Sequence, residues 1–379
     1  MILNRKGMRF ITQLFLILFC SISIMGQENT EAYSFFVAGH VYGKPGSNNE
    51  GFYPAFKDMF SYIQSRSEIK FGVLTGDIVS ANPVVTDWEE VDADILTLGL
   101  PVHFAVGNHD MENRPVYEER YGSTYYHFRY ESDLFIVLDP NLDNWNISGD
   151  QLQFLSEVLR EEVENNTNVF VFFHQLLWRG SHNEFNYITW NSGAGRDGDV
   201  NFWTDVEPMF NCLSNRVVMF AGDLGASWST DVTYDSYDNI TLIASGMGSD
   251  NGDNFIVVNV DSLKSVAYDL VCLEEEEPYC LGALTDFLMV SEVDTELTDW
   301  CQREFKVFPN PVVDYLTIRT NNLGATSIKL YNGFGEIVLN YSEQDQNEFS
   351  VYLGSLVSGV YYLKVFNGGN VESSKIVVR

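Results

Sequence analysis

Residues that can bind a metal ion follow five short apolar runs of this sequence. They are Ala38-Gly39-His40, Gly76-Asp77, Gly107-Asn108-His109-Asp110, His174 and Gly222-Asp223-Leu224-Gly225. Carboxylates, imidazoles and an Asn carbonyl can bind one or two divalent ions that orient a phosphoryl group and lower the pKa of a bound water. A His outside the ligand shell can then protonate the leaving oxygen. These residue types indicate metal-assisted hydrolysis.

The apolar runs are typical of strands in an α/β domain. They are rich in Val, Ile and Phe without strict alternation, as in strands that are covered on both faces. The runs span residues 32–38, 69–74, 101–106, 133–139, 168–174, 216–222, 240–245 and 254–260, and helical patterns span 53–66, 86–99 and 148–165. Because each polar group directly follows a strand, the side chains can converge on one edge of the sheets. The sequence therefore predicts an α/β fold of layered sheets and helices.

These motifs resemble those of the calcineurin-like metallophosphoesterase family over about residues 32 to 262. The most specific is "VGNHD" at 106–110, and "LTGDIV" at 74–79 supports it. "FFHQ" at 172–175 and "STYYHFRYESDLFIVLD" at 123–139, with the helical pattern that follows, are also similar. The resemblance implies a β-sandwich flanked by helices. It also implies hydrolysis of a phosphomonoester or phosphodiester by metal-activated water.

The same resemblance implies a role for each residue that matches a family motif. Asp77 would bridge two metal ions, and Asn108 and His174 would bind the second ion. His109 would be the acid near the leaving group, with Asp110 as its partner. The substrate would be a phosphorylated small molecule, glycan or lipid.

Two of the family motifs are incomplete. The opening D-x-H reads Ala38-Gly39-His40, so His40 would bind the first ion without the carboxylate expected at 38. The closing G-H-x-H reads Gly222-Asp223-Leu224-Gly225, where Asp223 could replace an imidazole with an oxygen. Two protein ligands are too few for a tight site, so we expect a one-metal or weakened two-metal centre. Divalent Mn, Mg, Ca, Fe and Zn are candidates, and the oxygen-rich ligand set favours Mn, Mg or Ca over Zn.

A second hypothesis follows from the incomplete motifs. The domain could be a catalytically degenerate surface protein that binds a phosphorylated glycan or lipid, or that supports surface polysaccharide assembly. In either case the loop from Arg179 to Trp203 could contribute specificity, because loops often carry it. This loop is aromatic and Gly-rich, and Arg179 and Arg196 are its available cations for a phosphate.

Residues 303–379 have a different pattern, with short strands separated by Gly, Asn and Asp and no helical stretch. This predicts a small all-β sandwich. The stretches "KVFPNPVVDYLTI", "SGVYYLKV" and "SSKIVVR" resemble the C-terminal sorting domain of the type IX secretion system. The resemblance implies an Ig-like sandwich, export by that machinery, and release or attachment at the cell surface. A generic carbohydrate-binding or adhesive sandwich is the alternative.

The N-terminal segment predicts entry into an export pathway. Basic residues at 5, 6 and 9 precede the apolar stretch "FITQLFLILF", so residues 1–26 are expected to be a signal peptide. No later apolar run approaches the roughly 20 residues that span a bilayer. The remaining chain divides into a phosphoesterase-like domain at 27–270, an acidic linker or extension at 271–302, and the sorting domain at 303–379.

Charge and cysteine content limit the partners and the compartment. The chain holds 22 basic and 53 acidic residues. This balance excludes nucleic acid as a bulk partner, since such binding depends on neutralising phosphates. The four cysteines after the signal segment are Cys212, Cys272, Cys280 and Cys301. An even number in an exported chain favours two disulfides, for which three pairings are open. A zinc cluster is the weaker alternative, because there is no C-x-x-C spacing.

Overall fold

The structure is a computed structural model of the whole chain. It describes residues 31–46, 51–226, 228–249, 251–273, 281–293, 305–320, 326–343, 348–367 and 370–379. The predicted signal peptide, Cys280 and Cys301 lie outside these residues, so the signal peptide and the two disulfides remain predictions. Within the described ranges, no helix has both the length and the apolar character needed to cross a membrane.

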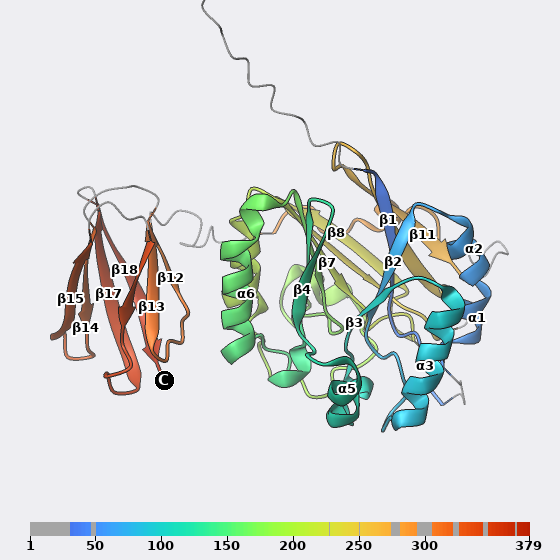
Figure 1. The fold of residues 1–379 in the computed structure, drawn as a ribbon, viewed down its shortest axis with the longest axis horizontal. Coiled ribbons are helices and arrows are strands. Elements are labelled where there is room, and N and C mark those ends of the chain that lie inside the picture. Colours follow the sequence, from blue (N-terminus) through green and yellow to red (C-terminus); the bar gives the residue numbers. More distant parts are fainter. Residues whose placement is uncertain are drawn as a thin grey trace, which may run out of the picture.

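The first domain is a sandwich of two mixed β-sheets (Figure 1). The first sheet has the order β11-β10-β1-β2-β3, and the second has the order β4-β5-β6-β7-β9-β8. The strands of the first sheet are β1 (Tyr33–Ala38), β2 (Ile69–Thr75), β3 (Val102–Ala105), β10 (Asn254–Val260) and β11 (Val266–Cys272). Those of the second are β4 (Tyr126–Tyr130), β5 (Asp133–Val137), β6 (Asn168–Phe172), β7 (Arg216–Ala221), β8 (Val232–Tyr237) and β9 (Ile240–Ser245). All eight predicted strands are confirmed.

Parallel pairing places the same ends of neighbouring strands at one edge. In the first sheet β1 pairs in parallel with β2, and β2 with β3. In the second sheet the parallel pairs are β5–β6, β6–β7 and β7–β9. Five strands therefore have their carboxyl ends at one edge, and the candidate metal-binding residues follow these ends. The strands are β1, β2, β3, β6 and β7.

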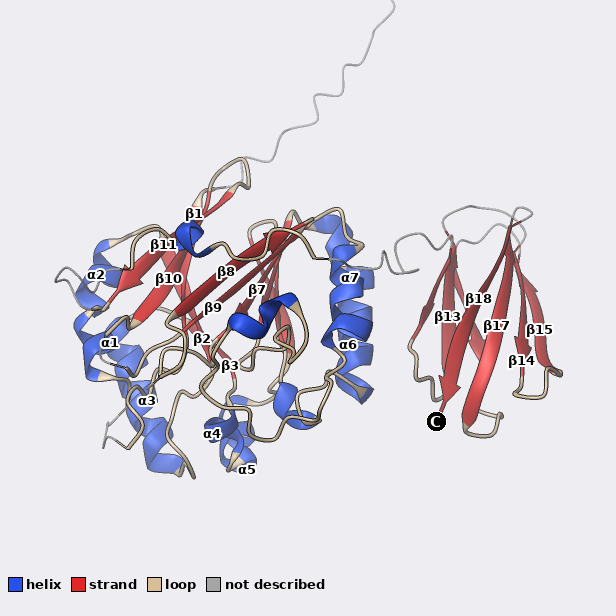
Figure 2. Ribbon diagram, turned by 180° about the vertical axis from the view of Figure 1, so that it is seen from behind, coloured by secondary structure: helices blue, strands red, loops and turns tan. Residues whose placement is uncertain are grey.

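Helices cover the outer faces of both sheets, which completes the layered sandwich (Figure 2). The first sheet packs against α1 (Pro54–Asp58), α2 (Phe60–Ser65) and α3 (Val85–Leu98), and the second packs against α6 (Gly149–Glu161). Shorter helices follow the strands as α4 (Asn108–Met111), α5 (Arg114–Tyr121) and α7 (Glu207–Asn211). Between the sheets lies an aromatic core in which Phe35 contacts Phe71 and Phe135 at ring-centroid distances of 5.2 and 5.3 Å. The predicted α/β architecture is confirmed.

The C-terminal domain is all β. One sheet has the order β12-β13-β16 and the other the order β15-β14-β17-β18. Their bounds are β12 (Phe305–Phe308), β13 (Tyr315–Thr320), β14 (Thr326–Tyr331), β15 (Ile337–Glu343), β16 (Glu348–Tyr352), β17 (Gly359–Asn367) and β18 (Asn370–Val378). A separate apolar core, which includes Leu316, Ile328 and Leu363, lies between the sheets. This confirms the predicted small sandwich.

Part of the predicted linker belongs structurally to the first domain. In the described residues 281–293, Leu284 and Val290 are buried in its core clusters. The N–H of Val290 donates to Asp235 on β8 at 2.8 Å. These residues cover the edge strand β8 and shield its unpaired edge from solvent.

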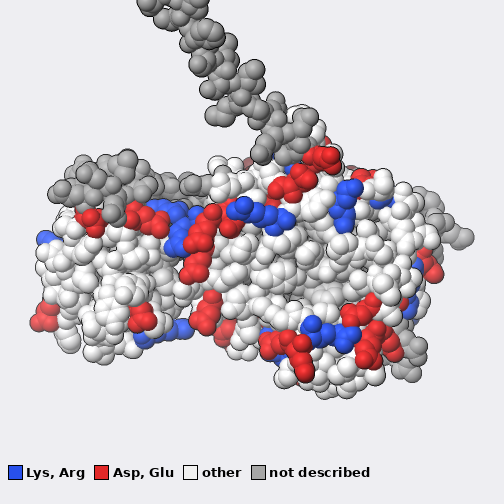
Figure 3. Space-filling model, in the orientation of Figure 1, with Lys and Arg blue, Asp and Glu red and all other residues white. Residues whose placement is uncertain are grey.

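The charged side chains of the face in Figure 3 are mixed in sign. Asp and Glu groups are interspersed there with Lys and Arg groups. The acidic excess of the chain is therefore not gathered into one patch on that face.

The two sheets approach each other so closely at the site edge that glycine is required there. A Cβ atom on Gly222, just after β7, would lie 1.9 Å from the carbonyl oxygen of Thr75, the last residue of β2. A Cβ atom on Gly39 would lie 2.4 Å from the carbonyl oxygen of Ser245. Both obstacles are backbone atoms, which cannot rotate away as a side chain can.

We therefore expect Gly222→Ala to lower the free energy of unfolding of the first domain by about 1–3 kcal/mol, because the added methyl group forces the sheet ends apart. Denaturation by guanidinium chloride measures this change. Gly198→Ala is the matched control, because a Cβ there meets no atom within 4 Å. Its effect should stay within about 0.5 kcal/mol. Equal stability of the two variants would contradict the close approach of the sheets.

Candidate metal centre

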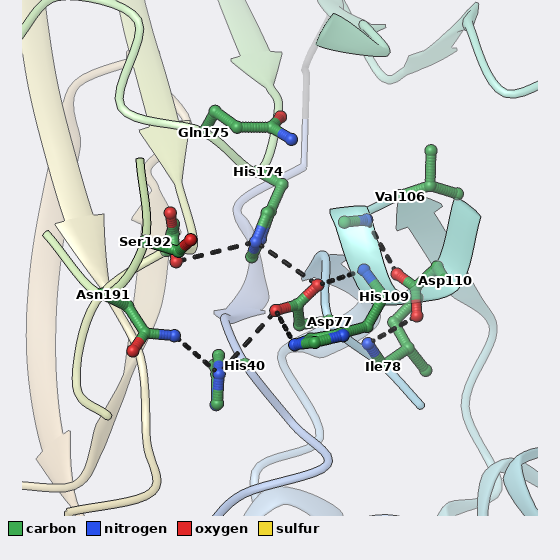
Figure 4. Close-up of polar contacts among 12 residues, drawn as sticks. His40, Asp77, Ile78, Val106, His109, Asp110, His174, Gln175, Asn191 and Ser192 are labelled. Carbon is green, nitrogen blue, oxygen red and sulfur yellow. Dashed lines mark hydrogen bonds and ion pairs between the residues drawn. The ribbon is translucent and has the colours of Figure 1, made fainter. Parts of the chain in front are cut away.

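The predicted site residues come from five strand ends and meet at one edge (Figure 4). His40 follows β1, Asp77 follows β2 and His174 follows β6. Backbone hydrogen bonds hold these ends together: the N–H of His40 donates to Gly76 at 3.0 Å, and the N–H of Asp223 donates to the carbonyl of His174 at 3.0 Å. Convergence of scattered residues on one edge is thus what the structure shows.

Asp77 lies at the centre of the cluster and is buried, with 1% of its surface exposed. Its Oδ2 lies 3.7 Å from His40 Nε2 and 3.8 Å from His109 Nε2, and its Oδ1 lies 3.4 Å from His174 Nε2. Burial alone would raise the pKa of Asp77, but the neighbouring imidazoles, His174 above all, hold it well below its usual range. Asp77 is therefore a buried anion that faces three imidazole nitrogens.

His174 has one ring nitrogen fixed and the other aimed at carboxylates. Its Nδ1 donates to the carbonyl oxygen of Thr75 at 2.9 Å, and Nε2 faces Asp77 and Asp223. Although burial opposes its charge, the carboxylate of Asp77 raises the pKa of His174 to about 10. With this pKa the ring carries a proton on both nitrogens in the metal-free centre, so a metal ion must displace the proton on Nε2. The Nδ1–H bond to Thr75 then leaves Nε2 as the ligand atom, the arrangement commonly found in metal-ligating histidines.

Asp223 is the second carboxylate that faces His174 Nε2. Its Oδ1 is 3.8 Å from His174 Nε2, and the side chain is fully buried. By strict geometry neither of its oxygens accepts a hydrogen bond among the described residues, although the Ser192 N–H and the Asn191 amide lie near enough to lower its pKa. Nε2 of His174 likewise has only the long contacts with Asp77 and Asp223. Burial raises the pKa of Asp223 to about 7. Buried polar atoms without partners are costly, and an absent ion is one of the established explanations for them.

The donor atoms stand slightly too far apart to bind an ion as they are. No three His, Cys, Asp or Glu residues in the described part of the chain converge closely enough to hold one. Ligand atoms at about 2.1 Å from an ion lie about 3.0–3.4 Å apart. The 3.4 Å between His174 Nε2 and Asp77 Oδ1 already fits this spacing, and the 3.8 Å between His174 Nε2 and Asp223 Oδ1 requires a small closing movement of the side chains.

We call the side of the cluster around His40 and Ala38, where the family resemblance implies the first ion, the first-metal half. A side chain that the sequence did not predict contacts His40 there. Asn191 reaches His40 Nε2 with its amide Nδ2 at 3.0 Å, and its backbone N–H donates to the carbonyl of Asp223 at 3.2 Å (Figure 4). Ala38 is fully buried in the apolar cluster beneath α1–α3. Burial lowers the pKa of His40 to about 4, so its ring is neutral. No spacing in the sequence marks Asn191, because it comes from a loop far along the chain.

The predicted acid, His109, is the most accessible imidazole of the centre, with 28% of its side chain exposed. Its Nδ1 lies 3.3 Å from Glu112 Oε1, and its ring meets Tyr42 edge to face at a centroid distance of 5.6 Å. Glu112, rather than the predicted Asp110, is thus the carboxylate beside this ring. The spacing of three residues on α4 could have indicated Glu112, since such residues share one helix face.

Asp110 has a different position from the predicted one. Its Oδ1 accepts from the N–H groups of Ile78 and Val79 at 2.8 and 3.0 Å, and its Oδ2 accepts from Gly107 at 2.7 Å. Burial, with the charge of Asp77, raises the pKa of Asp110 to about 6. Asp110 therefore joins the loop after β2 to the start of α4 and acts on the site through the backbone.

Asn108 is the first residue of α4 and is half-buried at the same edge. The next residue, His109, donates its N–H to Asp77 Oδ1 at 3.1 Å. Asn108 is therefore brought beside the centre, together with Asp77, His174 and Asp223.

Comparison with known families agrees with this geometry. Residues 39–203 match the calcineurin-like phosphoesterase family, and residues 306–379 match the secretion system C-terminal sorting domain. Residues 39–203 are therefore assigned to the calcineurin-like phosphoesterases, a family of hydrolases, and residues 306–379 to a domain for export by type IX secretion. Both family resemblances of the sequence are confirmed, as is a location at the cell surface or outside the cell.

Several individual proteins are similar to parts of the chain. The purple acid phosphatase PPD1 from yellow lupin (Lupinus luteus) is 14% identical with a TM-score of 0.45, over 69% of this chain and 54% of that one. The protein TT1561 of Thermus thermophilus is 11% identical with a TM-score of 0.35, over 63% of this chain and 99% of that one. Ulvan lyase NLR42 of Nonlabens ulvanivorans is 34% identical over 76 residues, which are 19% of this chain and 14% of the lyase. The chain thus spans less than two thirds of the lupin phosphatase and of the lyase.

Removing the charge of Asp110 on α4 should lower the free energy of unfolding more than removing the charge of Glu112, which directly follows α4. Asp110→Asn replaces one acceptor oxygen with an NH2 group that faces a backbone donor, so we expect it to lower the free energy of unfolding by about 1–3 kcal/mol. Glu112→Gln, at a partly exposed position, should change it by less than about 0.5 kcal/mol. Urea denaturation of both variants measures the difference. A larger loss for Glu112→Gln would contradict the positions of these carboxylates.

Proposed function

We propose that the protein is an exported phosphoesterase that hydrolyses a phosphomonoester or phosphodiester with one divalent metal ion. The observation that carries this proposal is the set of buried atoms without hydrogen-bond partners: Nε2 of His174 and both oxygens of Asp223, beside the anion Asp77. These atoms have the chemistry of metal ligands, and they lie where the family resemblance implies the second ion.

Asp77, Asn108, His174 and Asp223 would hold the ion. The set contains two carboxylates, an amide and one imidazole, which suits Mn, Mg or Ca better than Zn. When bound, the ion supplies Lewis-acid polarisation of the phosphoryl group and lowers the pKa of water. The orientation of the His174 ring is already fixed by Thr75, so binding would release the proton on Nε2 without turning the ring.

The contacts of the first-metal half support one ion instead of two. The Nε2 atom of His40 is engaged by the Asn191 amide at 3.0 Å. Ala38 offers no donor and lies in an apolar core, and Gly225 has no side chain. In this half, Asn191 supplies the polar contact that an ion would otherwise supply to His40.

The proton for the leaving group would come from His109. This ring is partly exposed, so a substrate can reach it, and it lies 3.8 Å from Asp77 at the centre. Glu112 is placed to orient the ring through Nδ1 at 3.3 Å, which leaves Nε2 toward the reacting group. We assign His109 as the general acid and Glu112 as its positioning residue.

Metal content tests this proposal directly. After loading with Mn²⁺ and desalting, the purified protein should retain about one ion per chain, because one complete set of donors is present. Asp77→Asn and Asp223→Asn should reduce the retained metal at least about tenfold. Elemental analysis measures the ratio. Asp269→Asn is the control, because Asp269 pairs with Arg66 on the surface, away from the strand ends that carry the centre.

Turnover of aryl phosphate monoesters and diesters completes the test. Mn²⁺-loaded protein should hydrolyse at least one of these substrates, and Asp77→Asn should lower the rate at least about 100-fold. A wild-type protein that binds no metal and shows no turnover with added Mn²⁺ would reject the proposal. That result would favour the non-catalytic surface protein that binds a phosphorylated glycan or lipid.

A further inference from the structure

The loop that supplies Asn191 also carries two arginines that stand together on the ring of Trp190. Arg179 lies over the Trp190 ring, with its guanidinium carbon 3.9 Å from the ring centroid. Arg196 lies 5.1 Å from the same centroid and 5.6 Å from that of Trp145. The two tryptophans contact each other edge to face at 5.6 Å. Two cations thus share one aromatic platform.

These arginines lack the acidic partners that a strongly acidic chain would readily provide. Among the described residues, neither forms an ion pair, although other arginines of the chain, such as Arg114 and Arg120, do. The Nε atom of Arg196 is buried and has no hydrogen-bond partner. The Nε atom of Arg179 donates only to the carbonyl of Ile188, at 3.2 Å. Donor groups on both side chains therefore remain available for a ligand.

The electrostatics of the pair favour an anion. Burial, followed by the neighbouring charge of Arg179, lowers the pKa of Arg196, and Asp199 acts against them. Burial also lowers the pKa of Arg179. Two partly buried like charges destabilise each other, and a bound oxyanion would relieve this repulsion through charge-assisted hydrogen bonds.

The platform is joined rigidly to the metal centre. The residue after Trp190 is Asn191, whose side chain contacts His40 and whose backbone N–H donates to Asp223. Thr230 donates its N–H to the carbonyl of Thr189 at 2.8 Å, which fixes the residue before the tryptophan. A group bound at the arginines is therefore held on a loop that is anchored to the centre.

We propose that Arg179 and Arg196, on the Trp190 platform, form an anion-binding subsite that takes a second oxyanion group, such as a sulfate or phosphate, of the substrate. As a substrate subsite this rests on the function proposed above. Its capacity to bind an oxyanion does not, because none of the proposed metal ligands belongs to it. The substrate class would be phosphoesters that carry an additional acidic group near the scissile ester.

Titration of metal-free protein with sulfate tests the subsite, with tryptophan fluorescence as the readout and chloride at equal ionic strength as the blank. Sulfate should produce a saturable change in the wild type, because Trp145 and Trp190 both contact the guanidinium groups. Arg179→Gln and Arg196→Gln should each weaken the binding at least about tenfold, since each removes a charged donor. Arg120→Gln, which breaks an ion pair with Asp92 outside this loop, should leave the binding unchanged.

Asp77→Asn separates this proposal from the proposed function. The variant should lose metal but keep the sulfate response, since the subsite does not use Asp77. Absence of a saturable response in the wild type, its survival in both arginine variants, or its loss in Asp77→Asn would overturn the subsite. Sulfate binding without any phosphoesterase turnover would leave the subsite intact and reject the hydrolytic function instead.

Discussion

The structure depends on one buried carboxylate, Asp77, that must remain charged at a junction of two sheets. Burial penalises its charge, and the neighbouring imidazoles, His174 foremost, outweigh that penalty. Asp77 also has a left-handed backbone conformation, with φ of 48°. Such strain persists only where the surroundings enforce it. The close glycines at the strand ends and the hydrogen bonds of Asp110 provide that enforcement, so the fold around the site serves to keep this anion in place.

The incomplete family motifs have a physical counterpart in the centre. Ala38 is packed among apolar side chains, so the position of a lost ligand has become part of the core. The Asn191 amide contacts Nε2 of the remaining His40 and so gives that atom of the buried ring a polar partner. On the other side, Asp223 supplies buried oxygens that accept no hydrogen bond of strict geometry in the described part of the chain. The cluster is therefore asymmetric, with one half closed by the protein itself and the other half open to an ion.

Much of this arrangement could be predicted from the sequence, since strands that are covered on both faces are continuous apolar runs. The three unpredicted strands, β4, β8 and β11, are all edge strands. Exposed positions interrupt the apolar pattern of β4 and β11, and Thr233, Asp235 and Ser236 interrupt that of β8. The ends of the apolar runs correctly brought Asp77 and His174 to one edge. The three-residue spacing of His109 and Glu112 was a usable signal for the carboxylate beside His109, but the family resemblance pointed to Asp110 instead. Asn191 was beyond prediction, because its contact with His40 joins residues 151 positions apart through a loop.

The central claim is that the cluster binds a single ion on the side of His174 and Asp223. Anomalous X-ray diffraction from crystals of the protein grown with Mn²⁺ tests it most directly. The account predicts one strong peak in contact with His174 Nε2 and the Asp223 carboxylate, and the Asn191 amide still against His40. Two peaks of equal strength that flank Asp77, or no peak while Asp77, His174 and Asp223 keep their present contacts, would contradict it.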